Sequence, residues 1–386
     1  MINDGHTQYG ELGLIGMRGC EDLADSIDYY LTRYRSETHP DGQLSMEDAP
    51  PQISPGRYQV KASCHRFNTG EGKALIQQSV RGYDLYILTD VFNYSVTYQM
   101  FGEEARMSPD DHFQDLKRII AAAGGKARRI TVIMPMLYEG RQHRRNARES
   151  LDCALALQEL RRMGVENIIT FDAHDPRVQN AIPLSGFENV HPTYQMLKAL
   201  FKACPDINAG RDNLMIISPD EGAMTRCIYY SSVLSVDLGM FYKRRDYATL
   251  KNGRNPIIRH EFLGDNVRGK DVIVVDDMIS SGDSILGIAP ILKKRGARRI
   301  MMFATFGLFT SGLDRFDEAY EKGLIHKIFT TNLIYRPEGL RDRPWYCEVN
   351  MAKYISYIIE TLNYDRSISD LLEPAKRIRV LLEKRK

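Results

Sequence analysis

Val274-Val275-Asp276-Asp277-Met278-Ile279-Ser280-Ser281-Gly282-Asp283-Ser284 runs from an apolar strand through two carboxylates into a loop of small polar residues. In open α/β sheets, ligands bind beyond the carboxyl ends of strands, where such a loop can turn N–H groups and hydroxyls toward a phosphate at a helix N-terminus. The stretch therefore predicts a phosphate site, with Asp276 and Asp277 placed to bind sugar hydroxyls. A strand that ends in Asp before a Gly turn is also common without a ligand, so the pattern alone leaves both interpretations open.

Apolar runs of the same kind recur along the chain, near residues 84, 129, 167, 213, 271, 299 and 327. Runs that are apolar throughout are typical of strands buried on both faces, so they predict parallel sheets in an α/β protein. Amphipathic segments of helix length lie between them, at 110–123, 148–163, 193–203 and 284–296. The first should end at Gly124-Gly125, and Pro290 lies inside the last.

So many βα units exceed one small open sheet, and the sequence SGFENVHP at 185–192 has the Gly, Asn and Pro residues of a boundary. We therefore expect two α/β domains, at 1–190 and 191–345, followed by C-terminal helices at 346–386 that pack back on the first domain. The region 35–56 is rich in Pro, Asp, Glu, Ser and Gly without periodicity, which predicts a surface insertion. The two halves could share a fold.

The composition of the 386 residues excludes several classes of protein. Lys and Arg number 52 against 50 Asp and Glu, so a net charge of +2 gives no overall field for nucleic acid or an anionic membrane. The six cysteines include no Cys-x-x-Cys pair, which argues against a zinc site and a disulfide-stapled secreted fold. Without a signal-like start or an apolar run of about 18 residues, a cytoplasmic protein is expected.

Further segments accompany the opening stretch in a fixed order: RFNTGE (66–71), PMLYEGRQHRR (135–145), FDAHDPRVQ (171–179), ISPDEGAMTR (217–226) and FYKRR (241–245). Each is weak alone, but together they resemble the ribose-phosphate pyrophosphokinase family over nearly the whole chain. The resemblance implies two tandem phosphoribosyltransferase-like domains, with ATP between them and ribose 5-phosphate on the second. It also implies a homo-oligomer that depends on Mg²⁺ and converts these substrates to phosphoribosyl diphosphate and AMP.

The resemblance assigns roles to two groups of residues in these segments. Lys243 and Arg245 match the catalytic basic pair, although an isolated Lys-Arg-Arg is more often a solvated turn. His174 and Asp220 match magnesium positions, and each follows an apolar strand. Mg²⁺ prefers oxygen ligands, so His174 is expected to act through water.

Four further residues match positions that contact ATP in the family. Phe67 and Glu71 correspond to residues that bind adenine, and Arg141 and Gln142, with His174, correspond to other ATP contacts. Without the resemblance, Phe67 would more often belong to a core, and Arg141 to a basic surface patch.

This chain departs from the family at three places. The ribose 5-phosphate loop, Ser280-Ser281-Gly282-Asp283-Ser284, stands where the family usually has Asp-Thr-Gly-Gly-Thr. Ser281 and Ser284 keep hydroxyl donors, but Ser280 lacks the carboxylate that the family has near the reacting sugar. Asp283 adds a charge that should turn away from the phosphate or be screened by Mg²⁺ or a basic side chain. Elsewhere Thr69 and His143 each replace an Asp of the family.

The sequence leaves two rival functions open. A non-catalytic regulatory relative is favoured by the altered loop but disfavoured because Lys243, Arg245, His174 and Asp220 are all present. A phosphoribosyltransferase that joins phosphoribosyl diphosphate to a base would need only one such domain and no ATP segments.

Overall fold

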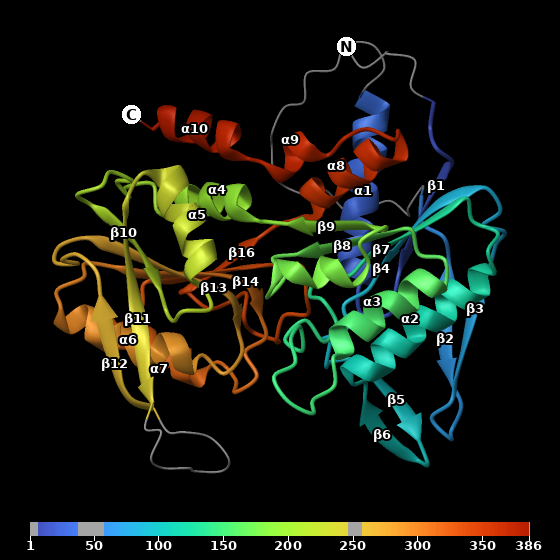
Figure 1. The fold of residues 1–386 in the computed structure, drawn as a ribbon, viewed down its shortest axis with the longest axis horizontal. Coiled ribbons are helices and arrows are strands. Elements are labelled where there is room, and N and C mark those ends of the chain that lie inside the picture. Colours follow the sequence, from blue (N-terminus) through green and yellow to red (C-terminus); the bar gives the residue numbers. More distant parts are fainter. Residues whose placement is uncertain (1–6, 38–57, 246–256, 386) are drawn as a thin grey trace. The chain divides into compact units, whose positions relative to one another are not determined.

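The computed structural model describes residues 7–37, 58–245 and 257–385, which form two compact α/β units (Figure 1). The first unit consists of Met1–His191, Asn332–Tyr335 and Asn350–Leu372, and the second of Pro192–Thr331, Arg336–Val349 and Glu373–Lys386. The division after His191 lies next to the boundary expected at 190. Among the described residues, no helix is long and apolar enough to cross a membrane.

The first unit is built on a five-stranded parallel sheet with the order β1-β4-β7-β8-β9. Its strands are β1 (Glu11–Gly16), β4 (Tyr83–Leu88), β7 (Arg129–Ile133), β8 (Asn167–Phe171) and β9 (Gly186–Val190). Its helices are α1 (Glu21–Glu37), α2 (Pro109–Ala123), α3 (Asp152–Arg162), α8 (Ala352–Asn363) and α9 (Ser369–Leu372), with a 3₁₀ turn at Pro176–Ala181. Two hairpins, β2 (Ala62–Arg66) with β3 (Gly72–Ile76) and β5 (Thr97–Met100) with β6 (Glu103–Arg106), project from it.

The second unit has a seven-stranded sheet with the order β12-β11-β10-β13-β14-β15-β16, in which only β11 and β12 are antiparallel. The strands are β10 (Leu214–Ser218), β11 (Asp237–Arg245), β12 (Ile257–Leu263), β13 (Asp271–Ile279), β14 (Ile300–Gly307), β15 (Lys327–Thr331) and β16 (Tyr346–Val349). The helices are α4 (Thr193–Ala203), α5 (Met224–Leu234), α6 (Asp283–Lys294), α7 (Asp314–Glu321) and α10 (Ala375–Glu383).

The chain order of the second sheet fixes where a ligand can bind. From β10 the chain passes outward to β11 and β12, then returns to the other side of β10 and continues through β13 to β16. The carboxyl ends of β10 and β13 therefore flank a topological switch point, which is where open α/β sheets form their ligand crevices.

All seven apolar runs expected to be strands are strands, and the expected helices are present. The start of α2 is fixed by Ser108, whose hydroxyl accepts the Asp111 N–H while the Asp111 carboxylate accepts the Ser108 N–H. The same helix ends at Gly124, as expected, in a left-handed conformation (φ 57°). The expectation of a shared fold is also confirmed, because the order β1-β4-β7-β8-β9 recurs as β10-β13-β14-β15-β16.

Three details differ from the sequence-based expectations. The boundary segment contains a strand, β9, and the range 346–386 begins with the edge strand β16 before its helices. These helices are divided, because α8 and α9 belong to the first unit and α10 to the second. The expected insertion at 35–56 begins within α1, and its residues 38–56 lie outside the described part of the chain.

Two helices pack on the unit that does not contain the strand before them. Helix α4 follows β9 of the first unit but packs on β15 and β16 of the second. Helix α8 follows β16 of the second unit but lies beside α1 in the first (Figure 1). The two units thus exchange equivalent helices, because an amphipathic helix specifies an apolar partner and not which sheet provides it.

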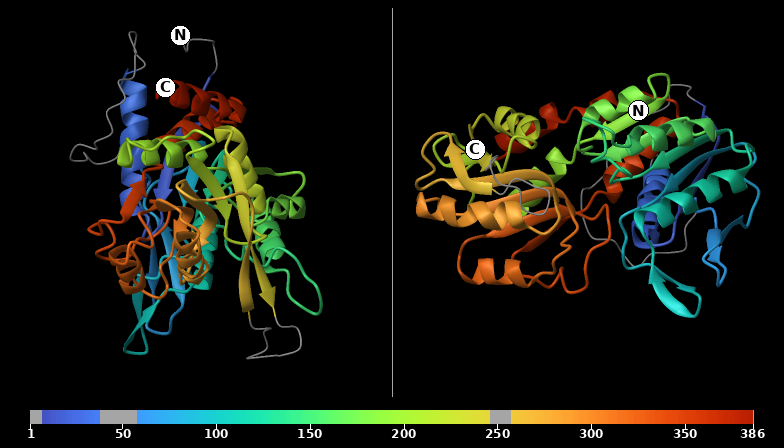
Figure 2. Two further views of the ribbon diagram at one scale, coloured as in Figure 1. Left: turned by 90° about the vertical axis from the view of Figure 1, so that its left-hand side faces the viewer. Right: turned by 60° about the horizontal axis from the view of Figure 1, so that its bottom comes forward.

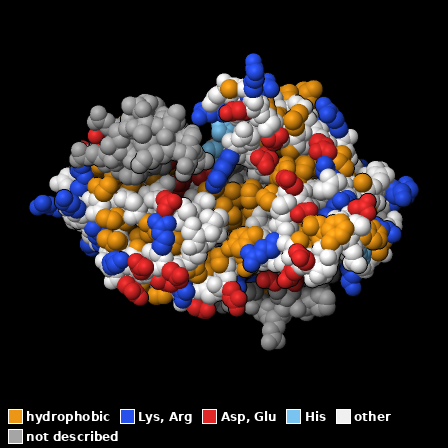
Figure 3. Space-filling view, turned by 90° about the horizontal axis from the view of Figure 1, so that it is seen from below, with side chains coloured by type: hydrophobic (Ala, Val, Ile, Leu, Met, Phe, Trp, Pro, Cys, Tyr) orange, Lys and Arg blue, Asp and Glu red, His pale blue; other side chains and the backbone are white. Residues whose placement is uncertain are grey.

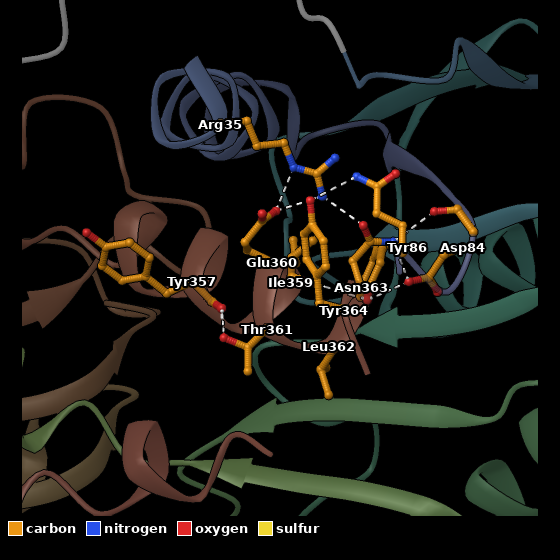
Figure 4. Close-up of polar contacts among 12 residues, drawn as sticks. Arg35, Asp84, Tyr86, Tyr357, Ile359, Glu360, Thr361, Leu362, Asn363 and Tyr364 are labelled. Carbon is orange, nitrogen blue, oxygen red and sulfur yellow. Dashed lines mark hydrogen bonds and ion pairs between the residues drawn. The ribbon is translucent and has the colours of Figure 1, made fainter. Parts of the chain in front are cut away.

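A buried ion pair joins two neighbouring strands of each unit at their amino ends. In the first unit, Arg129 donates to both oxygens of the fully buried Asp84 at 2.8 and 2.7 Å. Asn363 of α8 donates to the same carboxylate at 2.9 Å, so the ion pair also holds the exchanged helix (Figure 4). In the second unit, Arg299 binds both oxygens of Asp271 in the same way, at 3.0 and 2.7 Å.

We predict that Asp84→Ala lowers the free energy of unfolding by roughly 3–5 kcal/mol, because it leaves the Arg129 guanidinium buried without its counter-charge. Urea unfolding of the full chain measures this. The matched control is Glu318→Ala, which breaks an exposed pair with Lys322 and should cost less than about 1 kcal/mol. Equal losses in both variants would show that the buried pair has no special role.

Candidate active site

Three carboxylates meet at the switch point of the second unit. Asp220 follows β10, and Asp276 and Asp277 lie near the carboxyl end of β13. One oxygen of Asp276 accepts the Asp277 N–H at 2.9 Å. Burial, with the nearby carboxylates of Asp277 and Asp220, raises the pKa of Asp276 well above its usual range, while Arg226 acts in the opposite direction. This edge of the sheet therefore favours ligands that bring cations or hydrogen-bond donors.

A tight turn after β10 holds Asp220 in place. Its side-chain oxygen accepts the N–H groups of Gly222 and Ala223 at 3.0 and 3.4 Å. The buried Ser218 hydroxyl donates to the Asp220 carbonyl at 2.6 Å. The turn leads directly into α5, which carries Arg226 toward the carboxylates.

The loop between β13 and α6 requires glycine at its centre. Gly282 has φ 84°, and a Cβ atom there would lie 2.3 Å from Cζ of Phe316. Because Gly282 is also the N-cap of α6, no N-cap side chain competes for the N–H groups of the first helical turn. On the other side of the loop, the Ser280 carbonyl accepts the Thr310 N–H at 3.0 Å. The loop is thus shaped to present backbone N–H groups beyond the strand ends.

Asp283 is screened, as the sequence analysis expected. The Ser281 hydroxyl donates to one carboxylate oxygen and Arg315 of α7 donates to the other, each at 2.7 Å. Both hydrogen bonds lower the pKa of Asp283, and the one from Ser281 has the larger effect. Arg315 belongs to none of the short motifs quoted above, and only the fold brings it to the loop.

Lys243 and Arg245 lie at the end of β11, beyond the part of that strand that pairs with β10. Lys243 is paired with His260 and Arg245 with Ile257, and the register shifts between Arg244 and Arg245. The structure describes this backbone but not these side chains, and residues 246–256 lie outside the described part of the chain.

In the first unit, the segment after β7 meets the segment after β8. The rings of His143 and His174 have centroids 5.5 Å apart, so Arg141 and Gln142 lie in a segment adjacent to His174. His143 Nε2 lies 3.4 Å from the Asp175 carboxylate. Hydrogen bonds from Arg177, with a smaller effect of His143, lower the pKa of Asp175 to about 2. His143 thus stands beside an anion that the fold keeps ionised.

Phe67 and Glu71 form the turn of the β2–β3 hairpin, closed by the Phe67 N–H on the Glu71 carbonyl at 2.8 Å. Phe67 is 55% exposed, so it is not a core residue. Thr69 donates its hydroxyl to the Glu71 carboxylate at 3.0 Å. Where the family has a second acidic residue, this chain therefore has a hydrogen-bond donor to the first. Figure 3 shows hydrophobic side chains among charged ones on the face from which the hairpins project.

The first turn of α2 joins the two ATP segments expected from the sequence. Arg66, at the end of β2, donates to the Asp111 carbonyl at 3.3 Å, and Tyr138 donates to the Asp110 carboxylate at 2.6 Å. The structure therefore collects the expected ATP residues on one unit and the expected ribose 5-phosphate residues on the other. His174 and Asp220, which match magnesium positions of the family, lie in different units. Within the described residues, no group of three His, Cys, Asp or Glu side chains could hold a metal ion.

Comparisons with known proteins agree on one family. The model of the N-terminal domain of ribose phosphate pyrophosphokinase matches residues 12–164, and that of the phosphoribosyl transferase domain matches 187–325. A ribose-phosphate pyrophosphokinase of Chromobacterium violaceum is 27% identical over 315 residues, which cover 81% of this chain and 86% of the relative. One from Ralstonia nicotianae is 29% identical over 256 residues, covering 65% of this chain and 72% of the relative.

A crystal structure of phosphoribosylpyrophosphate synthetase from Mycobacterium smegmatis shares the fold. It matches with a TM-score of 0.71 and 20% identity, over 92% of this chain and 99% of that one. The pairing of two α/β units is therefore common to both chains.

We predict that Asp276→Asn stabilises the ligand-free protein at pH 7, because it removes a partly buried charge close to two other carboxylates. A raised folded-state pKa contributes stability that is fully present below the unfolded value of about 3.9 and is lost as the pH rises through the folded value. The gain should therefore be clear at pH 7 and vanish near pH 4. Urea unfolding at both pH values measures it, and a gain that does not depend on pH would contradict the electrostatic cause.

Proposed function

The chain belongs to the ribose-phosphate pyrophosphokinase family, and we propose that it transfers the diphosphoryl group of ATP to ribose 5-phosphate, releasing AMP. One observation supports this most strongly: the second unit has two carboxylates and a Gly-Ser loop at its switch point. The other unit matches the N-terminal domain of the same family. The chain therefore carries both parts of such an enzyme.

Ribose 5-phosphate is assigned to the second unit. Asp276 and Asp277 accept hydrogen bonds from the sugar hydroxyls, and the loop 280–284 with the first turn of α6 binds the phosphate. In support, Gly282 keeps this helix end free of an N-cap side chain, and Asp283 is already paired with Arg315. The acceptor carboxylates and the anion-binding loop thus match the two ends of a sugar phosphate.

ATP is assigned to the residues Phe67, Glu71, Arg141, Gln142 and His174. The exposed ring of Phe67 offers a face for stacking with adenine, and Glu71 in the same turn provides an acceptor for its amino group. The guanidinium of Arg141 suits phosphate oxygens. The first turn of α2, which holds both segments, supports a single nucleotide site on this unit.

Mg²⁺ is the cofactor that we propose, with Asp220 as a direct ligand and His174 acting through water. Mg²⁺ binds to nucleotide enzymes through one or two carboxylates, waters and substrate phosphates, so it does not require a cage of protein ligands. The mutual repulsion of Asp220 and Asp276 supports a nearby cation. When bound, the ion would neutralise charge on the transferring phosphates.

The chemical step needs positioning and cationic charge more than a covalent nucleophile. The ribose hydroxyl oxygen bonds to the β-phosphorus, the bond from that phosphorus to the oxygen of AMP breaks, and the hydroxyl proton is released. Lys243 and Arg245 stabilise the charge that spreads over the transferring group, the lysine as a point charge and the arginine as a fork for two oxygens. Their place at the carboxyl end of β11, a strand that runs parallel to β10 in the same sheet, supports this role.

The two rival functions are less well supported. The comparisons name pyrophosphokinases over most of the chain, which does not favour a phosphoribosyltransferase. The ion pair of Asp283 with Arg315 weakens one of the two arguments for a non-catalytic relative, while the other, the carboxylate missing at Ser280, is decided by the activity assay. The six free cysteines support a reducing, cytoplasmic location, and we propose a homo-oligomer as in the resemblance.

An assay of the purified chain with ribose 5-phosphate, ATP and Mg²⁺ tests the proposal by following AMP release. AMP should form in step with phosphoribosyl diphosphate. A chain that forms no AMP but consumes phosphoribosyl diphosphate when a purine or pyrimidine base is added would be a transferase, and a chain inactive in both assays would be the regulatory relative.

We predict that Lys243→Ala or Arg245→Ala lowers kcat by about 10²-fold or more while changing KM much less, because both charges act on the transferring group. Arg244→Ala, which removes the neighbouring charge on the same strand, is the matched control and should leave most of the turnover. Near-normal kcat in either test variant would remove that residue from the catalytic step.

A further inference from the structure

Helix α7 packs against the loop at 280–284 through the Phe316 ring below Gly282. Helices α6 and α7, drawn in orange in Figure 2, contribute buried side chains to the same hydrophobic core. The fully buried ring of Phe316 packs against Phe309 and Trp345, with centroid distances of 5.1 and 5.6 Å. Trp345 Nε1 donates to the Asp317 carboxylate at 2.7 Å. Phe316 also fills the space below Gly282, so this helix sets the height of the loop.

Arg315 precedes Phe316 and contacts the loop from the same helix. Its guanidinium donates to one oxygen of Asp283, while Ser281 donates to the other, so both oxygens are engaged away from the backbone N–H groups of α6. The side chains of Arg315 and Asp283 are 49% and 70% exposed. An ion pair this exposed adds little to stability, so its effect lies in where it places the charge of Asp283.

That charge matters because Asp283 is the first residue of α6, at the helix end assigned to the phosphate. An unpaired carboxylate there would repel a bound dianion, and a mobile one could bind the same N–H groups in its place. Gly282 and Ser284, the neighbours of Asp283, carry no charge that could offset it. Within the described residues, Arg315 is the basic side chain that forms an ion pair with it.

We propose that Arg315 is a positioning residue for phosphate binding, which holds Asp283 aside and neutralises it so that the loop can accept an anion. This inference rests on the proposed ribose 5-phosphate site. It explains how the chain tolerates an acidic residue in a phosphate loop: a basic residue on a separate helix compensates for it.

The test measures binding of ribose 5-phosphate and of inorganic phosphate by calorimetry in four full-length proteins: the parent chain, Arg315→Ala, Asp283→Asn and the double variant. Arg315→Ala should weaken the binding of both anions about 5-fold at low salt, and the loss should shrink at high salt. In the Asp283→Asn background, the same Arg315→Ala change should alter affinity less than about 2-fold, because no carboxylate remains to be held aside.

Two further variants separate charge from helix stability. Arg315→Lys keeps the positive charge and should retain most of the affinity. Lys322→Ala, which breaks the exposed pair with Glu318 on the same helix, is the matched control and should bind both anions like the parent chain. Thermal unfolding of all variants shows whether α7 remains folded.

The outcomes separate this inference from the proposed function. An equal loss from Arg315→Ala in both backgrounds, or no loss at all, would overturn the positioning role even if AMP release is normal. If Arg315→Ala weakens the binding of inorganic phosphate in the parent background but not in the Asp283→Asn background, and the chain releases no AMP, the inference stands and the proposed function falls. A parent chain that binds neither anion would overturn both.

Discussion

The buried pair of Asp84 and Arg129, with its counterpart Asp271 and Arg299, is the interaction on which the rest of the structure depends. Each pair joins neighbouring parallel strands at their amino ends. The guanidinium donates to both oxygens of one carboxylate, and it can do so in only one register of the two strands. Because a strand rises about 3.3 Å per residue, fixing its start also fixes where its side chains lie at the far end. Asp276, five residues after Asp271, therefore reaches the ligand edge at a set height, roughly 16 Å along β13.

Two aspartates in one short stretch illustrate how environment divides roles between identical side chains. Burial and, to a smaller extent, neighbouring carboxylates raise the pKa of Asp276, whereas hydrogen bonds from Ser281 and Arg315 lower the pKa of Asp283. Asp276 is therefore suited to accept hydrogen bonds or to lie near a cation, whereas Asp283 is a surface carboxylate whose charge is already paired. The fold thus keeps acceptors for the sugar without leaving an unscreened anion at the phosphate end.

The sequence predicted the parts of the fold that depend on local pattern. Apolar runs identified the strands, Gly124 ended its helix, and Gly282 marked a loop that only glycine can form. Interactions between distant segments could not be predicted from the sequence. An amphipathic pattern does not identify the sheet that a helix covers, and an exposed arginine gives no sign of its partner. Helix α8 and the contact of Arg315 with the loop are of this kind. For the side chains of Lys243 and Arg245, the assignment still rests on family resemblance.

The exchange of α4 and α8 bears on how such a chain can evolve. A gene broken after the codon for His191 would encode a first half without α8 and a second half in which α8 is separated from its partner α1. Neither product could bury its own apolar surface, so fission would yield fragments prone to aggregate in place of reusable modules. A duplicated chain whose two units exchange helices would thus be inherited only as a whole. New functions would then arise through changes in the loops, while the two domains remain in one chain.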